Sequence, residues 1–272
     1  MKYRLIAVDL DGTLLYNGNN IPEENLEAIR YAGSKGAIVV IATGRVTTSG
    51  RVFAKKLGLD TFVISSNGAR VYDLKNSGVI FEDSMDINDA KAVVRYFESY
   101  GTYYHAYVDD IMYARFMSEK LRFYTDQNKG LPQDLQMDIR ICEDYDSVFE
   151  KNIGKISKVM AISTDVVLLQ EMKKHIHENG NIVTMASDWN NLEVMNHSVG
   201  KGNALKYLAG YMGISREEVV AVGDNENDIS MIEWAGMGIA MDNATPAVKS
   251  MADHITDSCE NAGVAKAIYK YI

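Results

Sequence analysis

Two kinds of hydrophobic pattern alternate at both ends of the chain. One is a short, nearly continuous apolar run, which is typical of a strand buried on both faces. The other is an apolar stripe at helical spacing, such as Leu26, Ile29 and Ala32, in segments bounded by glycine or proline. This alternation predicts an α/β fold with a doubly wound, Rossmann-like parallel sheet. The strand-like runs are residues 3–8, 37–42, 61–65, 219–223 and 237–241.

The pattern changes in the middle of the chain. Residues 69–82 predict a hairpin, and beyond it the apolar segments become aromatic and less uniform. This mixture predicts an inserted α+β domain with a largely antiparallel sheet. We expect a discontinuous core of residues 1–83 and 191–272 and an inserted domain of residues 84–190. Its expected strands are 102–108, 156–162 and 181–185, and its expected helices are 87–100, 118–128 and 166–179.

Composition narrows the class of protein. The chain has 272 residues and a formal net charge of −9, which argues against general binding of nucleic acid or an anionic membrane. Cys142 and Cys259 form no CxxC pattern, so neither a zinc site nor a disulfide framework is expected. Apolar stretches are too short for a membrane span or a signal peptide. We expect a cytoplasmic monomer or small homo-oligomer.

Polar residues follow four of the predicted parallel strands. Asp9, Thr43, Asn67 and Asp224 each come at or just after the end of an apolar run. Ligands of an open parallel α/β sheet bind at the carboxyl ends of its strands, so these residues are expected to meet at one edge. A solvated strand end remains the alternative at each single position. A nucleotide-binding site is disfavoured, because the first turn contains neither G-x-G-x-x-G nor a P-loop.

Asp9 and Asp11 form a candidate catalytic pair. Residues two apart in an extended chain share one face, so their carboxylates point the same way if the spacing persists past the strand. Two such charges are costly unless a cation lies between them or one carboxyl keeps its proton. The alternative is a strand that ends in an acidic turn, since Asp-Gly is a common turn dipeptide.

Further carboxylates favour a metal site at the same edge. Asp9, Asp224 and Asp228 would form an oxygen-only set of ligands, which suits Mg²⁺. The alternative for Asp228 is a helix N-terminal residue that is stabilised by the helix dipole.

Lys201 and Thr43-Gly44 are candidate phosphate contacts. Lys201 begins a predicted helix, where a positive charge is disfavoured, so it either faces solvent or neutralises a bound anion. Thr43-Gly44 offers a hydroxyl and backbone N–H groups at a strand-to-helix turn. A plain helix N-cap is the alternative for Thr43.

Four segments resemble, in order, the motifs of the haloacid dehalogenase-like phosphohydrolases. The insertion between the second and third motifs resembles the large α/β cap of the Cof-type subfamily, and the resemblance spans nearly the whole chain. The presence of Asp11 favours a phosphatase over a dehalogenase, which lacks that second aspartate. The four segments are Asp9-Leu10-Asp11-Gly12-Thr13, Thr43-Gly44-Arg45, Lys201-Gly202 and Gly223-Asp224-Asn225-Glu226-Asn227-Asp228.

The resemblance implies a role for each motif residue. Asp9 would be the nucleophile that forms an aspartyl-phosphate, and Asp11 the general acid and base. Mg²⁺ would be bound by Asp9, the backbone carbonyl of Asp11 and Asp224, while Asp228 would help through water or by orienting a lysine. That lysine, Lys201, and Thr43 would hold the transferring phosphoryl group.

Substrate contacts are implied more broadly. Asn227 is an expected phosphate contact and Asn67 a substrate contact, while Arg45 would bind substrate, latch the cap or form a surface ion pair. The turn at 187–190 and Asn196 are candidates for specificity because they lie near the expected hinge. The expected activity is Mg²⁺-dependent hydrolysis of a small phosphorylated metabolite, most simply a sugar phosphate. The alternatives are a cofactor phosphate such as FMN or pyridoxal phosphate, phosphoryl transfer between substrate positions, and a catalytically silent phosphate-binding regulator.

Overall fold

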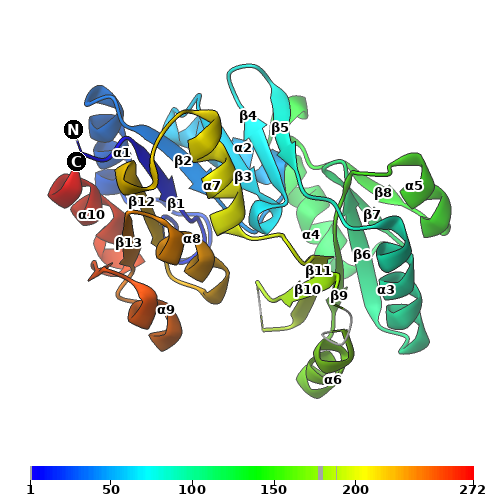
Figure 1. Cartoon of the computed structure of the whole chain (residues 1–272). Helices are drawn as coiled ribbons and strands as arrows, with labels where there is room; N and C mark the ends of the chain where they lie inside the picture. Colours follow the sequence, from blue (N-terminus) through cyan, green and yellow to red (C-terminus); the bar gives the residue numbers. More distant parts are fainter. Residues whose placement is uncertain (1, 177–179, 188) are drawn as a thin grey trace. The chain divides into compact units, whose positions relative to one another are not determined.

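A computed structural model of the protein describes residues 2–176, 180–187 and 189–272. The chain forms two compact units, one made of Met1–Phe81 with Gly200–Ile272 and the other of Glu82–Val199 (Figure 1). The first unit is therefore assembled from both ends of the chain, and the second is one continuous insertion.

An eight-stranded sheet forms the centre of the first unit. Its strands are β1 (Leu5–Val8), β2 (Ile38–Ala42), β3 (Phe62–Ser65), β4 (Arg70–Asp73), β5 (Gly78–Glu82), β12 (Val219–Gly223), β13 (Met237–Ala240) and β14 (His254–Ile255). Their order across the sheet is β14-β13-β12-β1-β2-β3-β4-β5. Neighbours from β14 to β3 are parallel, whereas β3 and β4 are antiparallel. The five strands predicted for this sheet are all present.

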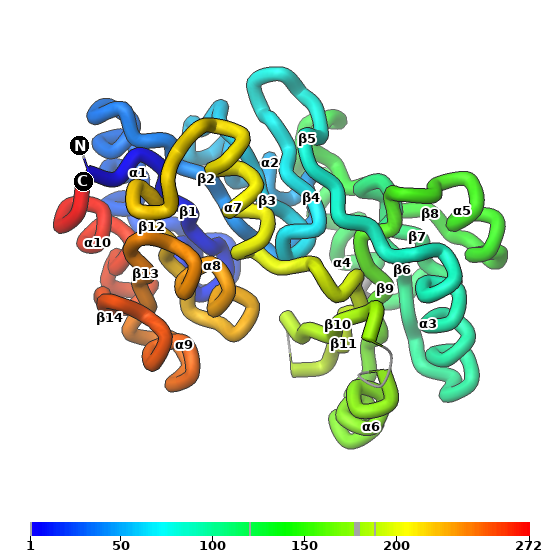
Figure 2. Tube along the Cα trace, in the orientation of Figure 1, coloured from blue at the N-terminus to red at the C-terminus, as the bar shows by residue number. Residues whose placement is uncertain are grey.

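Helices cover both faces of this sheet. They are α1 (Glu23–Ser34), α2 (Thr47–Leu57), α7 (Lys201–Tyr211), α8 (Ile229–Trp234), α9 (Pro246–Met251) and α10 (Gly263–Tyr271). Figure 2 shows how the C-terminal segment returns to the N-terminal one, with α10 beside α1 and β12 beside β1.

Side chains alternate between two apolar cores along β1, as the pleat of a strand requires. Ile6 and Val8 pack in the core that contains Phe53 of α2, while Leu5 and Ala7 pack in the core that contains Leu205 of α7. Burial on both faces explains why the parallel strands are continuous apolar runs. The doubly wound α/β class is confirmed.

The second unit is built on a six-stranded sheet. Its strands are β6 (Tyr103–Val108), β7 (Ile111–Ala114), β8 (Ile139–Ile141), β9 (Ile156–Ile162), β10 (Ile182–Met185) and β11 (Asn191–Asn196), and its helices are α3 (Ile87–Ser99), α4 (Glu119–Asn128), α5 (Tyr145–Lys151) and α6 (Val166–Ile176). The order is β10-β11-β9-β6-β7-β8, and among these described strands β7 and β8 are parallel while the other neighbours are antiparallel. One face packs on the buried side chains of α3, α5 and α6.

The sequence-based boundaries of the insertion need correction. The division falls after Phe81 and before Gly200, whereas the sequence placed it after residue 83 and before residue 191. The reason is β11, which pairs with β9 and β10 and so belongs to the inserted sheet. The predicted helix over 166–179 ends at Ile176, and residues 177–179 lie outside the described part of the chain. Among the described residues, every helix is too short or too polar to span a membrane.

Candidate active site

Two neighbouring parallel strands bring Asp9 and Asp224 together. Asp9 follows β1 and Asp224 follows β12, and the register pairs Val8 with Val222. The backbone N–H of Asp9 continues this ladder by donating to the carbonyl of Val222 at 3.0 Å. The fold thus places side by side two residues that are 215 positions apart in the sequence.

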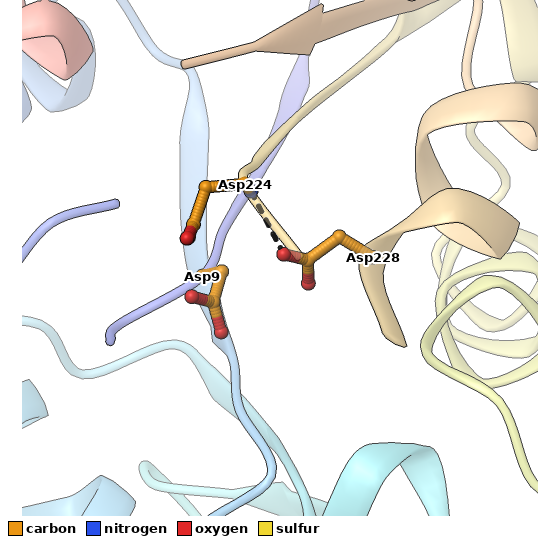
Figure 3. Close-up of side chains that lie close together, drawn as sticks. All are labelled: Asp9, Asp224 and Asp228. Carbon is orange, nitrogen blue, oxygen red and sulfur yellow. Dashed lines mark hydrogen bonds between the residues drawn. The ribbon is translucent and has the colours of Figure 1, made fainter. Parts of the chain in front are cut away.

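Three carboxylates gather at this strand edge. Asp9, Asp224 and Asp228 each offer an oxygen within 4.8 Å of the others (Figure 3). Asp228 comes from the short 3-10 turn Glu226–Asp228 that follows β12. One of its oxygens accepts the backbone N–H groups of Asp224 and Asn225, at 2.9 and 3.1 Å, which fixes the carboxylate relative to the loop.

Lys201 is fully buried against these carboxylates. It is the first residue of α7, and its Nζ donates to Asp9 Oδ1 at 2.6 Å and to Asp228 Oδ1 at 2.5 Å. Its side chain is 0% exposed, so the solvated alternative for this lysine is wrong. Asp228 accepts hydrogen bonds at both oxygens, which makes it a support for Lys201 and for the loop.

Charge at the cluster is unbalanced, because three carboxylates face one ammonium group. Burial raises the pKa of Asp9, and the nearby charge of Asp228 raises it further despite the opposing effect of Lys201. Burial likewise raises the pKa of Asp224 to about 6, against a hydrogen bond that lowers it. Burial alone would lower the pKa of Lys201, but the attraction of Asp228 and Asp9 outweighs it and raises that pKa. The site is therefore short of positive charge.

The donor set fits a hard divalent cation. All three candidate ligands are carboxylates, the chemistry that Mg²⁺ prefers. Asp9 gives one oxygen to Lys201 and Asp224 gives one to Thr13, whose hydroxyl donates at 2.6 Å. Among the described residues, the second oxygen of each carboxylate is left for another ligand, and a cation there would relieve the excess negative charge.

Two supporting residues were not assigned roles from the sequence. Thr13 is buried and orients Asp224, as just described. Asn243 donates to the carbonyl of Gly12 at 2.7 Å and accepts from the backbone N–H of Cys259 at 2.9 Å. Asn243 could have been found by extending the strand-end argument to β13.

Gly12 lies directly against Asp224. It has φ +83°, and a Cβ there would collide with the carboxylate of Asp224.

Thr43 lies on the same edge, after β2. It is fully buried, and its Oγ accepts the backbone N–H of Arg45 at 3.1 Å. Helix α2 begins only at Thr47 and has Val46 at its N-cap position, so Thr43 is not its N-cap.

Asn67 and Asn227 form an amide pair beside Gly44. Asn227 Nδ2 donates to Asn67 Oδ1 at 3.0 Å, and a Cβ at Gly44 would lie 2.7 Å from that same oxygen. Three successive residues of the turn, Ser66, Asn67 and Gly68, have positive φ angles of 49°, 57° and 97°. Left-handed conformations at non-glycine residues persist only where the surroundings enforce them, and they cluster at functional sites.

Asp11 and Asn196 lie outside the carboxylate cluster. The side chain of Asp11 is 55% exposed and is bonded to Arg45. Asn196 belongs to the second unit, where its amide donates to Asp83 and Ser198. In the turn at 187–190, Ser187 donates to Glu193, and Asp188 lies outside the described residues.

A doubly wound sheet that gathers aspartates and a buried lysine at its strand ends, with an α/β insertion, is the architecture of a haloacid dehalogenase-like enzyme. The model of the haloacid dehalogenase-like hydrolase family matches residues 6–268, and the chain belongs to this family. The resemblance inferred from the four motifs is thereby confirmed.

Relatives match along nearly their whole length. The chain is 34% identical to the 5-amino-6-(5-phospho-D-ribitylamino)uracil phosphatase YwtE of Bacillus subtilis, over 96% of each protein. It is 30% identical to the pyridoxal phosphate phosphatase YbhA of Escherichia coli, over 100% of each. Among solved structures, a haloacid dehalogenase-like hydrolase from B. subtilis superposes with a TM-score of 0.86 at 30% identity and covers 100% of both chains.

Proposed function

We propose that this protein is a Mg²⁺-dependent phosphatase that hydrolyses a small phosphorylated metabolite through an aspartyl-phosphate on Asp9. The observation that carries the proposal is the fully buried Lys201, bonded to Asp9 and Asp228 within a cluster of three carboxylates. Fixed positive charge of this kind is what a transferring phosphoryl group requires. The names of the curated relatives, which are phosphatases, support the same reaction class.

The metal would be held by the open oxygens of Asp9 and Asp224 and by the backbone carbonyl of Asp11. Bound there, Mg²⁺ would supply positive charge to the phosphate oxygens and to the carboxylates. Asp228 would stay behind the metal, because both its oxygens are already occupied by Lys201 and by two backbone N–H groups.

The chain's own residues would carry two half-reactions. In the first, a carboxylate oxygen of Asp9 bonds to phosphorus, the bond from phosphorus to the alcohol oxygen breaks, and Asp11 gives that oxygen a proton. In the second, water bonds to phosphorus, the bond to Asp9 breaks, and the proton of the water returns to Asp11. Lys201 and the hydroxyl of Thr43 would stabilise charge on the phosphoryl oxygens throughout.

The amide pair and the turn before α2 would bind the ester. Asn227 and Asn67 offer amide N–H groups beside Gly44, whose lack of a side chain leaves room for the amide of Asn67. We propose the backbone N–H of Gly44 as a phosphate contact, and Asn196 as a residue that affects specificity from the inserted unit.

The proposed reaction is tested with p-nitrophenyl phosphate. Wild-type protein should hydrolyse it with Mg²⁺ and lose activity with a chelator, and Asp9→Asn should be inactive in both conditions. Asp11→Asn should slow turnover by about 10²–10⁴-fold, the usual contribution of a general acid or base. Asp242→Asn, which removes an exposed carboxylate that pairs with Lys249, is the matched control. Equal turnover by wild type and Asp9→Asn would refute the proposal.

The substrate class has two candidates. A sugar phosphate is the first, and it follows from the sequence-based expectation. The second is an ester of the kind that the relatives at 30–34% identity are named for, pyridoxal phosphate or 5-amino-6-(5-phospho-D-ribitylamino)uracil. Specificity constants should be compared for sugar phosphates, pyridoxal phosphate, FMN and 5-amino-6-(5-phospho-D-ribitylamino)uracil. A silent regulatory protein would bind these esters without releasing phosphate. The presence of all the motif aspartates argues against such a protein.

A further inference from the structure

Arg45 makes a two-point contact with Asp11. Its Nε donates to Asp11 Oδ2 at 2.8 Å, and its Nη2 donates to Asp11 Oδ1 at 2.5 Å. A planar guanidinium that meets both oxygens of a carboxylate fixes the plane of that carboxylate as well as its position. Lysine could not reproduce this geometry, because its ammonium is a single point of charge.

The guanidinium of Arg45 is itself held in place by the first unit. Its Cζ lies 4.9 Å from the ring centroid of Phe53 on α2, and its Nη atoms approach Asn19 Oδ1 at 3.3 and 3.4 Å. Its backbone is tied at both ends, since its N–H donates to Thr43 and its carbonyl accepts from the N–H of Ser66. The Arg45 side chain is therefore held in one position, beside the turn before α2 that is proposed to bind phosphate.

The orientation of the Asp11 carboxylate requires a partner such as Arg45, whereas that of Asp9 does not. The Asp9 side chain is only 7% exposed and is held by Lys201, but the Asp11 side chain is 55% exposed on the loop that follows β1. An exposed carboxylate on a loop populates several rotamers unless a partner selects one. Proton transfer requires hydrogen-bond reach to the reacting oxygen, so this freedom would reduce its rate.

We infer that Arg45 is a positioning residue for Asp11, which sets the carboxyl group for proton transfer to and from the substrate. The inference rests on the proposed function, which makes Asp11 the acid and base. The contact is compatible with that role, because a carboxylate has about four acceptor sites and the guanidinium uses two of them. One of the remaining sites can carry the proton that passes to the leaving alcohol, and the same site can then take the proton of the attacking water.

Two other interpretations of Arg45 give different kinetics. If Arg45 mainly bound the phosphate, its loss would weaken every phosphate ester to the same extent. If the contact were an ordinary exposed ion pair, worth about 0.2–1 kcal/mol of stability, its loss would leave the kinetics almost unchanged. A positioning role instead makes the loss depend on how much the leaving group needs a proton.

The experiment measures kcat/KM for a series of esters whose leaving groups differ in basicity: 2,4-dinitrophenyl phosphate, p-nitrophenyl phosphate and an alkyl phosphate. This constant reports the steps up to departure of the alcohol. Arg45→Met should lower kcat/KM for the alkyl ester by about 10-fold or more, a part of what an acid contributes, and should barely change it for the dinitrophenyl ester. Arg45→Lys should recover little of the loss.

Two controls make the result specific. Lys56→Met removes another cation over the ring of Phe53, at 4.9 Å, and should leave the whole series unchanged. In the Asp11→Asn background, Arg45→Met should cause no further loss, because the group that it positions is already gone. Thermal unfolding of each variant shows that the protein is folded, and Arg45→Lys gives the same test if the methionine variant does not fold.

Several outcomes would overturn the inference. They are an equal loss across all the esters, no loss for any ester, or effects of Arg45→Met and Asp11→Asn that multiply. If Asp11→Asn lowers activity as expected and Arg45→Met shows one of these patterns, only the inference about Arg45 fails. If Asp11→Asn itself leaves the alkyl ester unaffected, the proposed function fails first, and the positioning role fails with it.

Discussion

Among the residues that the structure describes, each unit has a lysine buried against carboxylate, and the two sites differ in charge balance. In the first unit Lys201 meets Asp9 and Asp228, with Asp224 close by. In the second unit Lys158 of β9 meets Glu193 of β11 at 2.9 Å, and their side chains are 3% and 1% exposed. Both lysines are buried and paired, so burial alone does not show which of the two sites is catalytic.

The difference lies in what remains after pairing. The charges of Lys158 and Glu193 cancel, Ser187 donates to the second oxygen of the glutamate, and the ring of Tyr107 lies 5.1 Å from the ammonium. We therefore expect this buried pair to be a structural element. The cluster around Lys201 keeps an excess of carboxylate, and burial together with the nearby charge of Asp228 raises the pKa values of Asp9 and Asp224. Uncompensated charge of this kind marks a site built for a ligand.

The largest expected effect is on turnover. Lys201→Met should lower kcat by about 10²–10³-fold, since a fixed charge on the transferring group is lost. The matched control is Lys158→Met. Its Mg²⁺-dependent turnover per folded molecule should be unchanged when the folded fraction is measured by circular dichroism. Steady-state kinetics with p-nitrophenyl phosphate gives both values. If the two variants lost turnover equally, the distinction between a catalytic and a structural lysine would be wrong.

For stability, the large effect is expected at the pair of Lys158 and Glu193 in the second unit. Glu193→Gln removes the negative charge that Glu193 places beside the buried ammonium of Lys158, which should lower the free energy of unfolding by about 3–5 kcal/mol. Urea unfolding measures this loss. The double variant Lys158→Met with Glu193→Leu removes both charges and should recover most of the stability, because a buried pair can be replaced by apolar residues at little cost. An unchanged midpoint in Glu193→Gln would show that the pair is not structural.

Much of the first unit could be predicted from the sequence, because its strands are buried on both faces. Continuous apolar runs therefore marked β1, β2, β3 and β12, and the strand-end rule placed Asp9 next to Asp224. The end of the insertion was harder to place. β11 mixes apolar and polar residues and is followed by further polar residues, so its sequence does not say which sheet it joins.

Side-chain partners were the least predictable part of the site. From the sequence, Lys201 could either face solvent or lie against the carboxylates. The packing of α7 shows that it is buried. The contact between Arg45 and Asp11 depends on the path of two loops, which no local pattern specifies. Asn243 lies just beyond the short strand β13, so the strand-end argument would have included it only if it had been extended to that strand, and its bond to the carbonyl of Gly12 is visible only in the structure.

The pH dependence of stability offers a further test of the charge excess. The pKa of Asp224 is about 6 in the folded protein and 3.8 without the fold, so the folded state holds a proton that the unfolded state has released. The stability that Asp224 contributes is full below about pH 4 and is lost as the pH rises through about 6. The raised pKa of Asp9 acts in the same direction.

Mg²⁺ binds the ionised carboxylates and should reverse this loss. The increase in melting temperature caused by Mg²⁺ should be larger at about pH 7.5 than at about pH 5. Differential scanning fluorimetry with Mg²⁺ and with chelator measures both shifts. Asp224→Asn should remove most of the shift at the higher pH, whereas Glu193→Gln should keep it. A shift that is equal at the two pH values would contradict a carboxylate metal site.

The smallest expected effect concerns Thr13, which supports the metal site without being one of its ligands. Its hydroxyl donates to Asp224 Oδ1 at 2.6 Å and so restrains the orientation of that carboxylate. Thr13→Val keeps the shape of the side chain and removes only this hydrogen bond. Supports of this kind typically change metal affinity by about 10–100-fold, so the Mg²⁺ concentration for half-maximal activity should rise by about 10-fold while kcat at saturating Mg²⁺ changes little. Thr256→Val, which removes a buried hydroxyl bonded to the carbonyl of Gly263, is the matched control in the same unit. Equal Mg²⁺ dependence in the two variants would show that Asp224 keeps its orientation without Thr13, and that the backbone around Gly12 is enough to hold it.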